Sequence, residues 1–559
     1  MYGWQGKVLR VDLSKGLIKR ENIPETYQSY LGGRGLATKI FSEEVDPSIN
    51  PLSEENKIVL ATGPLTGTGA SSGCICSIVT KSPLTNTITC GQAKMYFGAE
   101  IKAAGYDLII IEGKSNSPVM LSIQDENIEL LPADYLWGET TLNTENAIRL
   151  AISDPWKARE TRILSIGPAG ERAEPISTII TDGLPVKNGV GIGAIFGIKG
   201  LKAIAIRGTR DIDLAYGKGF IEAVSSSIDT LKESETSKEF SDFGTYLLLE
   251  PLVKIGALGY ENFSRATPET VFSLSAKVFK KEIWKRNRGC FSCPIACLKQ
   301  TKLGFFPEID EFISLGPLCD IINPQVTLDA YRICIEYGLD AVEIGATMAC
   351  AMQLQEYLTF GKTQAFLETI KASGRGEEIA GILNKGALYL ARHFKSEDIF
   401  LGVKGRSIPP FDPRIIQGIG LQYATSNFGA THLTGFTLIE ELKDPSSIKG
   451  KAKLVRDYQD RTAILESMGI CPYAQFFLPL TIFIEMLNQA TGLDFKEEKI
   501  LKMGEDIYHI ERLFNTNAGI KNEDGLPPKM LRQPVNGMIS KLDKMLKEYY
   551  ELRGLGGEE

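Results

Sequence analysis

Several features that would point to common functions are scarce in this chain of 559 residues. It has only 3 histidines, no long basic run, and no apolar stretch that reaches the ~20 residues needed to span a bilayer. The net charge of −7 also argues against a nucleic-acid partner. We therefore expect no membrane span and no action on nucleic acid.

The N-terminus lacks the apolar segment of a signal peptide, and 10 cysteines in so long a chain do not suggest a disulfide scaffold. We expect a cytoplasmic protein, because a reducing compartment keeps thiols free to bind metal. A hydrophobic content of 43% and a charged content of 23% fit a soluble globular protein. The length predicts three or four domains of ~150 residues.

What the chain does contain is one closely spaced set of cysteines. Cys290, Cys293 and Cys297 follow the pattern Cys-x2-Cys-x3-Cys, and Cys471 lies far downstream. Three thiolates from one loop and a fourth from elsewhere can hold the corners of a cubane iron–sulfur cluster. Zinc competes, but it usually takes paired Cys-x2-Cys knuckles or Cys/His sets, and no second knuckle is present. We predict a [4Fe–4S] cluster; the alternative is four buried thiols that act as small hydrophobes.

Hydrophobic patterning divides the chain into a β-rich part and a helical part. Short apolar runs at 57–61, 108–113 and 202–208 each end near a glycine and predict strands, and 7–13 predicts a strand followed by a hairpin turn. Beyond Gly208 the apolar spacing becomes helical, at 218–238 and 327–360 and again at 478–489 and 499–515.

A link rich in proline and glycine at 403–414 marks a second boundary. The sequence thus predicts a β-rich domain at 1–208, a helical domain with the cysteine loop at 209–405, and a helical domain with the fourth cysteine at 406–559. The tail from Leu555 onward is expected to fray.

Several motifs, taken in order, resemble the tungstopterin aldehyde:ferredoxin oxidoreductase family. They are residues 61–70, 80–84, 103–107, 197–204, 338–340 and 423–427 with His432, together with the cysteine loop and Cys471. The resemblance extends from about Trp4 to about Phe514. It implies an α+β fold, in which an N-terminal two-sheet β-rich domain forms the cofactor base and two mainly α-helical domains cover it.

The same resemblance implies the cofactors and the reaction. A tungsten or molybdenum atom would be held by two pterins beside the [4Fe–4S] cluster, with Mg²⁺ as a candidate bridge between pterin phosphates. The implied reaction oxidises an aldehyde to a carboxylic acid, or the reverse, under anaerobic conditions. The acceptor would be ferredoxin or a ferredoxin-like electron-transfer subunit, in a homo- or hetero-oligomer.

Two segments are implied to hold the pterins, Gly338-Leu339-Asp340 and Glu466 with Gly469-Ile470. A carboxylate suits a pterin edge because it accepts hydrogen bonds from the ring amino group and NH. The alternative for Asp340 is a solvated acid that follows a helix C-cap glycine.

The phosphate side departs from the family pattern. Cys74 and Gly189 stand where the family has arginines, and Ile335 replaces an acid. The loop Gln92-Ala93-Lys94 would supply Lys94 as the replacement charge, and the amides of Gly189-Val190-Gly191 would hold phosphate. A dinucleotide interpretation of this glycine run is rejected, because no acidic residue follows in a βαβ context.

The candidate catalytic residues are one histidine and a group of acids. His432 lies in the family's Asn-x-Gly-x-x-His segment, and imidazole exchanges protons near neutral pH. The resemblance places a glutamate at Asp310, with Glu308 or Glu311 as substitutes. The alternatives are a core or capping histidine and a solvated acidic turn.

These departures leave a second class of function open. An electron-transfer or structural paralogue would keep the fold and the [4Fe–4S] cluster but have a degenerate or absent pterin site. Cys74, Gly189, Met95, Phe428 and Ile335 favour that alternative. The retained His432, Asp340, Glu466 and four cluster cysteines favour the enzyme.

Overall fold

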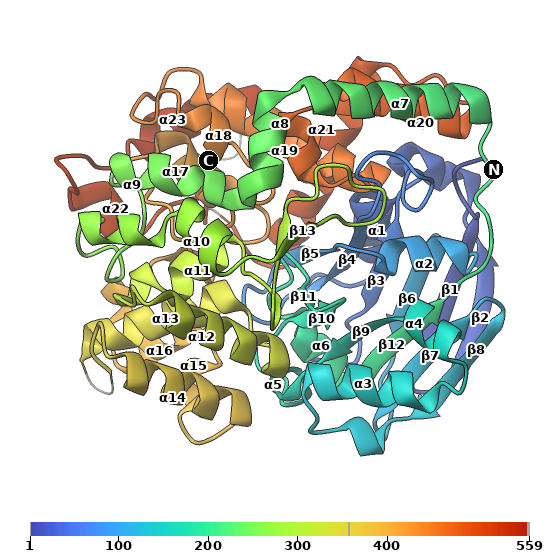
Figure 1. Ribbon diagram of the computed structural model, residues 1–559, viewed down its shortest axis with the longest axis horizontal. Coiled ribbons are helices and arrows are strands. Elements are labelled where there is room, and N and C mark those ends of the chain that lie inside the picture. Colours follow the sequence, from blue (N-terminus) through green and yellow to red (C-terminus); the bar gives the residue numbers. More distant parts are fainter. Residues whose placement is uncertain (1, 356–357, 522, 556–559) are drawn as a thin grey trace.

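The structure is a computed structural model that describes residues 2–355, 358–521 and 523–555. The β-rich part, blue to teal in Figure 1, lies on one side, and the helical parts, green to red, lie against it. Among the described helices, none is both long enough and apolar enough to cross a membrane. The tail that was expected to fray lies, beyond Leu555, outside the described residues.

The first sheet has six strands in the order β2-β1-β6-β3-β4-β5. Its strands are β1 (Lys7–Asp12), β2 (Leu17–Asn22), β3 (Ile58–Thr62), β4 (Cys76–Lys81), β5 (Ile88–Ala93) and β6 (Leu108–Glu112). The predicted hairpin is confirmed, because β1 and β2 pair antiparallel from Lys7–Asn22 to Asp12–Leu17. Helix α1 (Gly33–Glu44) packs on β3 and β4.

The second sheet also has six strands, in the order β11-β10-β9-β12-β7-β8. These are β7 (Val119–Gln124), β8 (Asn127–Pro132), β9 (Arg162–Ile166), β10 (Ile179–Thr181), β11 (Leu184–Pro185) and β12 (Leu201–Arg207). Leu9 and Ile109 of the first sheet share one buried cluster with Leu164 and Ile204 of the second. The two sheets therefore enclose a common core, which confirms the predicted two-sheet base.

Two of the predicted helices are each divided in the structure. The segment 218–238 becomes α7 (Gly217–Glu233) and α8 (Glu235–Phe243), because Ser234 ends one helix and its side chain caps the next. The segment 327–360 becomes α12 (Pro324–Tyr337) and α13 (Ala341–Leu354). There Gly338 takes the left-handed conformation at φ 73°, and Asp340 caps α13. Apolar periodicity continued through both breaks, so the pattern alone did not reveal them.

The cysteine loop belongs to a small sheet at the edge of the helical part. This sheet comprises β13 (Arg286–Arg288), β14 (Leu298–Thr301) and β15 (Gly304–Phe305), and it leads into α11 (Ile309–Leu315). The expected link at 403–414 contains a two-stranded hairpin, β16 (Gly402–Val403) and β17 (Arg406–Ser407).

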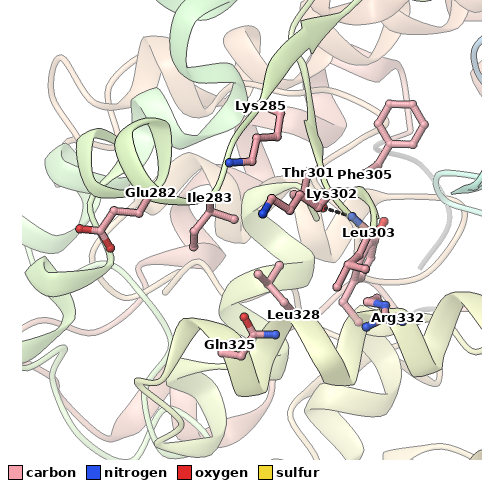
Figure 2. Close-up of a pocket in the computed structure, with 11 residues that line it drawn as sticks. Glu282, Ile283, Lys285, Thr301, Lys302, Leu303, Phe305, Gln325, Leu328 and Arg332 are labelled. Carbon is pink, nitrogen blue, oxygen red and sulfur yellow. Dashed lines mark hydrogen bonds between the residues drawn. The ribbon is translucent and has the colours of Figure 1, made fainter.

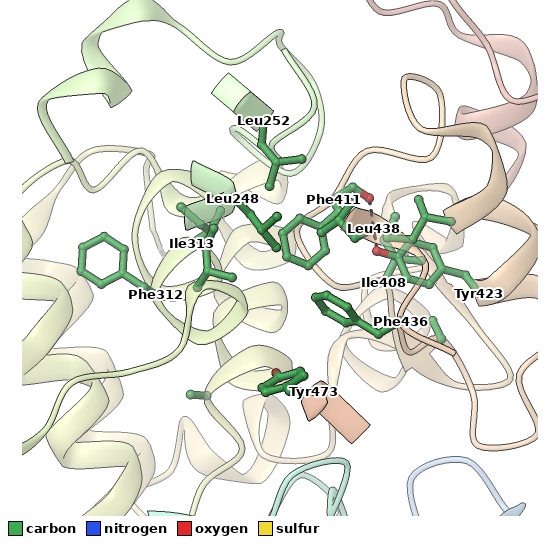
Figure 3. Close-up of a cluster of buried hydrophobic side chains, with 14 of the residues drawn as sticks. Leu248, Leu252, Phe312, Ile313, Ile408, Phe411, Tyr423, Phe436, Leu438 and Tyr473 are labelled. Atoms are coloured by element: carbon green, nitrogen blue, oxygen red, sulfur yellow. Dashed lines mark hydrogen bonds between the residues drawn. The ribbon is translucent and has the colours of Figure 1, made fainter. Parts of the chain in front are cut away.

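Helices resume beyond that hairpin. The main ones are α17 (Gln417–Thr425), α19 (Lys451–Met468), α20 (Leu480–Thr491), α21 (Glu497–Asn517) and α23 (Leu542–Arg553), with the 3-10 helix η7 (Pro472–Phe476) after α19. The two helical parts share one hydrophobic cluster, in which Leu248 lies beside Phe411 (Figure 3). The division at 405 stays a prediction; the buried core continues across it.

Candidate functional site

The four candidate cluster cysteines are brought together by backbone hydrogen bonds to one glycine-rich loop. The amide of Ser72 donates to the carbonyl of Ser292, between Cys290 and Cys293, at 3.0 Å. The carbonyl of Ser72 accepts from the amide of Cys471, also at 3.0 Å. One residue of the β3–β4 loop thus ties the cysteine loop to the remote cysteine.

The thiols also contact this loop. The Oγ of Ser72 lies 3.3 Å from the Sγ of Cys293. A hydrogen bond with Cys74 lowers the pKa of Cys290, whereas burial raises the pKa of Cys471 to about 12. Cys74, where the family pattern has an arginine, therefore lies beside the cysteine loop.

The cluster itself stays a prediction. Among the residues that the structure describes, no three or more His, Cys, Asp or Glu side chains converge on a single ion position. A cubane would need its four thiolates at separate corners. The contacts of Ser72 with Ser292, Cys293 and Cys471 bring the cysteine loop and the remote cysteine to one loop of the base.

The acids at the start of α11 are buried, so the interpretation as a solvated acidic turn is wrong. Glu308 and Glu311 form a reciprocal capping box, in which the amide of Glu308 donates to the Glu311 carboxylate at 2.8 Å. Lys94 lies 2.7 Å from Glu308, and Lys187 lies 2.7 Å from Glu311. Lys187 is also 3.5 Å from Glu308 and 3.5 Å from Asp310. We call Lys94, Lys187, Glu308, Asp310 and Glu311 the acid–lysine cluster.

The groups of the acid–lysine cluster have pKa values that are shifted in different directions. Burial alone would raise the pKa of Glu308, but Lys187 and Lys94 outweigh it and hold that pKa far below its usual value. Burial raises the pKa of Glu311 to about 7 despite its contact with Lys187. The pKa of Lys187 is raised because three acids outweigh its burial. Glu308 and Lys187 are therefore charged at neutral pH, while Glu311 is close to its titration point.

His432 lies at the edge of the acid–lysine cluster. Its Nε2 is 3.9 Å from Asp310 Oδ2, and its Nδ1 is buried without a hydrogen-bond partner among the described residues. The rings of Phe411 and Phe436 lie 5.1 Å and 5.2 Å away. Burial lowers the pKa of His432 to about 4, so the imidazole is neutral at pH 7. Two of the three residues predicted for catalysis, His432 and Asp310, thus lie close together.

The two implied pterin segments each join a helix end to the β-rich base. The amide of Thr178 donates to the carbonyl of Gly338 at 2.8 Å, and the amide of Ile75 donates to the carbonyl of Gly469 at 3.0 Å. Gly338 is the helix C-cap glycine of the alternative interpretation, but Asp340 is half-buried and its side chain accepts from the amides of Val342 and Glu343, so it caps the next helix and is not a solvated acid. Leu339 and Ile470 are buried in the core.

Glu466 is also buried, and it binds Arg34 at 3.0 Å. The Nε of Arg34 also forms an ion pair with Oε1 of Glu511 at 2.7 Å. Burial raises the pKa of Glu466 to about 7 even with this partner.

The phosphate-side segments lie next to one another. The backbone of Gln92, which precedes Ala93, exchanges two hydrogen bonds with that of Lys187, at 2.8 Å and 3.1 Å. Gly191 has φ 87°, and a Cβ there would lie 2.7 Å from Ser82 Oγ, so the loop Gly189-Val190-Gly191 requires glycine at its end. Lys94, the expected phosphate partner, is engaged by Glu308.

One cavity collects residues from several of these segments. Its lining includes Gln92, Lys94, Lys187, Asn188, Glu466, Cys471 and Tyr473. Sequence reasoning missed four participants: Lys187, Arg34, Arg406, which hydrogen-bonds Asn188, and Tyr473, which donates to Glu308 at 2.8 Å. Lys187 and Arg34 do lie beside glycine-rich loops that were singled out, and a charge next to such a loop was the available signal.

Comparison with solved structures identifies the architecture. The chain matches the active-site complex BamBC of benzoyl coenzyme A reductase, in complex with 1,5-dienoyl-CoA, with a TM-score of 0.85 and 21% identity. The match covers 99% of this chain and 95% of the other. At this identity the likeness shows the fold.

Comparison with protein families gives the more particular assignment. The family described as aldehyde ferredoxin oxidoreductase, N-terminal domain, matches residues 8–208, and that of domains 2 and 3 matches 222–558. The chain belongs to the aldehyde ferredoxin oxidoreductase family. This confirms the predicted family, the α+β fold class and the oxidoreductase class.

Named relatives cover nearly the whole chain. A tungsten-containing aldehyde ferredoxin oxidoreductase of Pyrococcus abyssi is 36% identical over 99% of this chain and 96% of its own length. That of Pyrococcus furiosus is 34% identical with the same coverage. An aliphatic sulfonate oxidoreductase, WOR-like subunit, of Pyrococcus furiosus is 25% identical over 99% of this chain and 94% of its own length.

Proposed function

We propose that this chain is a pterin-dependent tungsten or molybdenum oxidoreductase with a [4Fe–4S] cluster, and that it oxidises an aldehyde to a carboxylate or catalyses the reverse. The observation that carries the proposal is the shared cavity, which Cys471 and Glu466 line together with both lysines of the acid–lysine cluster. One candidate cluster ligand, one candidate pterin contact and the two lysines that bind the α11 acids thus face one space. The names of the relatives support tungsten and an aldehyde substrate.

The residues present fit the proposed cofactors. Cys290, Cys293, Cys297 and Cys471 would hold the cluster, while Asp340 and Glu466 would contact the pterins. The amides of 189–191 would face phosphate, with Mg²⁺ as a candidate bridge. When bound, the pterin-held metal would accept two electrons, and the cluster would pass them on singly to ferredoxin or an iron–sulfur partner subunit.

The chain's own part in the reaction is to move protons. An aldehyde and one water give a carboxylate, three protons and two electrons. His432 is neutral at pH 7, so its imidazole has a nitrogen free to accept a proton, which burial opposes; the carboxylate of Asp310, 3.9 Å from Nε2, would stabilise the imidazolium that forms. Glu311, with a pKa of about 7, can take up or release a proton beside Lys187, whose ammonium group stays charged and stabilises the carboxylate. The aromatic rings around His432 exclude water.

The test is the exchange of His432 for alanine in anaerobically purified protein. We expect His432→Ala to lower kcat for viologen-coupled aldehyde oxidation by roughly 10²–10⁴ with unchanged iron and tungsten content. His393→Ala, at an exposed histidine on α16 (Ala387–His393), is the matched control. A near-normal kcat in the His432→Ala protein would assign the proton transfer to another residue.

The second candidate is the electron-transfer or structural paralogue. One observation favours it: Lys94 and Glu466, both expected to bind the cofactor, already pair with Glu308 and Arg34. Metal and pterin analysis after growth with tungstate separates the candidates. About four iron atoms and one tungsten or molybdenum per chain support the enzyme, whereas iron without pterin supports the paralogue.

A further inference from the structure

A second cavity, of about 250 Å³, opens at the surface on the opposite side of the acid–lysine cluster. It lies between the small sheet β13–β15, the end of α10 (Ala276–Glu282) and α12 (Figure 2). We call it the surface pocket. Its volume suits a small molecule with a short apolar body.

Positive charge dominates the rim of the surface pocket. Lys285, Lys302 and Arg332 line it against one acid, Glu282. Figure 2 shows the amino groups of Lys285 and Lys302 on the same side of the opening. Neither lysine has an ion-pair partner among the described residues.

Arg332 meets carboxylates only at 3.7 Å and 4.0 Å, both on its own helix. The two ammonium groups without an acidic partner, together with a guanidinium held only at this longer range, can bind a carboxylate at a concave site.

The floor of the surface pocket is apolar. Ile283, Leu303 and Leu328 contribute to it, and Leu303 is 62% exposed at the rim. The combination of an apolar floor and a basic rim matches a carboxylate that carries an alkyl or aryl group.

Tyr331 connects this pocket to the buried site. The same side chain lines the surface pocket and a small inner cavity, whose walls include Lys187, Glu308 and Glu311. Tyr331 is 2% exposed and packs within the main hydrophobic cluster. It thus forms part of the wall between the two cavities.

We propose that the surface pocket is the mouth of the route between solvent and the acid–lysine cluster, that it recognises a carboxylate with an apolar body, and that Tyr331 separates it from the inner cavity. The proposal rests on the proposed function, because oxidation of an aldehyde yields such a carboxylate. The aldehyde enters where its charged product leaves. The substrate class is therefore alkyl and aryl aldehydes whose acids fit the pocket.

The first experiment measures binding and requires no turnover. Benzoate is titrated calorimetrically at low salt into the wild type and into the Lys285→Glu/Lys302→Glu protein. We expect roughly a tenfold or greater rise in Kd, since two charge-assisted contacts become repulsive. Lys277→Glu/Lys281→Glu is the matched control, because these exposed lysines of α10 carry the same charge but do not line the pocket. Equal loss of affinity in both proteins would overturn the proposal.

The second experiment tests access to the buried site. Leu328→Trp narrows the mouth, so kcat/KM should fall roughly tenfold more for a bulky aromatic aldehyde than for acetaldehyde, with metal content and thermal midpoint unchanged. The same loss for both aldehydes would overturn the route. If the wild type oxidises no aldehyde while benzoate binding still depends on Lys285 and Lys302, the proposed function fails and carboxylate recognition by the pocket stands.

Discussion

Two turns that end helices in the helical part share one backbone pattern but finish in different residues. In the first, α12 ends at Gly338 and the chain continues through Leu339 to Asp340. In the second, α19 ends at Gly469 and continues through Ile470 to Cys471. Both glycines are left-handed, at φ 73° and 89°, and both turns bury the middle residue.

The turns attach to different sheets of the base. The first turn pairs with the segment that leads into β10 of the second sheet, where the amide of Asp340 donates to the carbonyl of Ile176 at 2.9 Å. The second turn pairs with the β3–β4 loop of the first sheet, where the amide of Leu65 donates to the carbonyl of Met468 at 3.0 Å. The two related turns thus contact the base at its two different sheets.

The difference lies in the last residue of each turn. The carboxylate of Asp340 caps α13, whereas the thiol of Cys471 lies among the other predicted cluster cysteines. The carboxylate of Asp340 thus has partners in its own helix, through Oδ1 alone, whereas the thiol of Cys471 lies where the sequence predicts a cluster ligand. The predictions below test that contrast.

The largest effect, on iron content, is expected from substitution of the last residue of each turn. Cys471→Ser should reduce iron from about four atoms per chain and bleach the brown absorbance, because one corner of the proposed cluster is lost. Asp340→Ala should leave iron unchanged and cost about 1 kcal/mol through loss of the helix cap. Iron analysis and urea unfolding make the measurement.

Asp340→Asn is the matched control for the first turn, because asparagine caps a helix about as well as aspartate. Its stability should stay within about 0.5 kcal/mol of the wild type. Full iron content in the Cys471→Ser protein would contradict the predicted ligand set.

A smaller effect is expected from the two glycines. A Cβ at Gly469 would lie 2.0 Å from Thr66 Oγ1, and one at Gly338 would lie 2.9 Å from the amide nitrogen of Gly167. Gly469→Ala should therefore destabilise by roughly 3 kcal/mol and Gly338→Ala by roughly half as much.

Gly519→Ala is the control, since Gly519 has the same φ of 89° with nothing within 4 Å of the added Cβ. It should show only the backbone cost of about 1 kcal/mol in urea unfolding. If Gly469→Ala behaved like Gly519→Ala, the close packing of the second turn on the β3–β4 loop would be disproved.

The smallest effect concerns one buried acid near each turn. Burial raises the pKa of both Glu343 and Glu466 to about 7. As the pH rises, the unfolded state releases these protons at its pKa of about 4.5, whereas the folded state keeps them until about pH 7. Stability is therefore greatest below about pH 4.5 for these groups and declines as the pH rises toward 7.

Glu466→Gln should remove on the order of 1 kcal/mol of this decline, since Arg34 keeps Glu511 as a partner. Glu343→Gln should remove a similar part of the decline. The gain is reduced by the free energy of the hydrogen bonds that Ser407 donates to the Glu343 carboxylate. The measurement is urea unfolding at several pH values between 4.5 and 7.5. An unchanged pH dependence in both proteins would show that the acids stay ionised.

Much of the fold was predictable because its signals are local. Apolar runs that end at glycine located β3, β6 and β12, and the hairpin turn after β1 located β2. The divided helices were not predicted, because Gly338 and Ser234 interrupt hydrogen bonding without interrupting the apolar pattern. The cysteine spacing located the loop but gave no indication that Ser72 joins it to Cys471.

The sequence by itself determined the family, through the joint order of its motifs, and through that resemblance the two-sheet base; the cluster ligands and the proton acceptor stay predictions. Only the tertiary structure decided the partners: Lys187 against three acids, Arg34 against Glu466, and Asp310 beside a neutral His432. The physical reason is that burial and neighbouring charge set the protonation of these groups. Both arise only when segments distant in the chain are packed against one another.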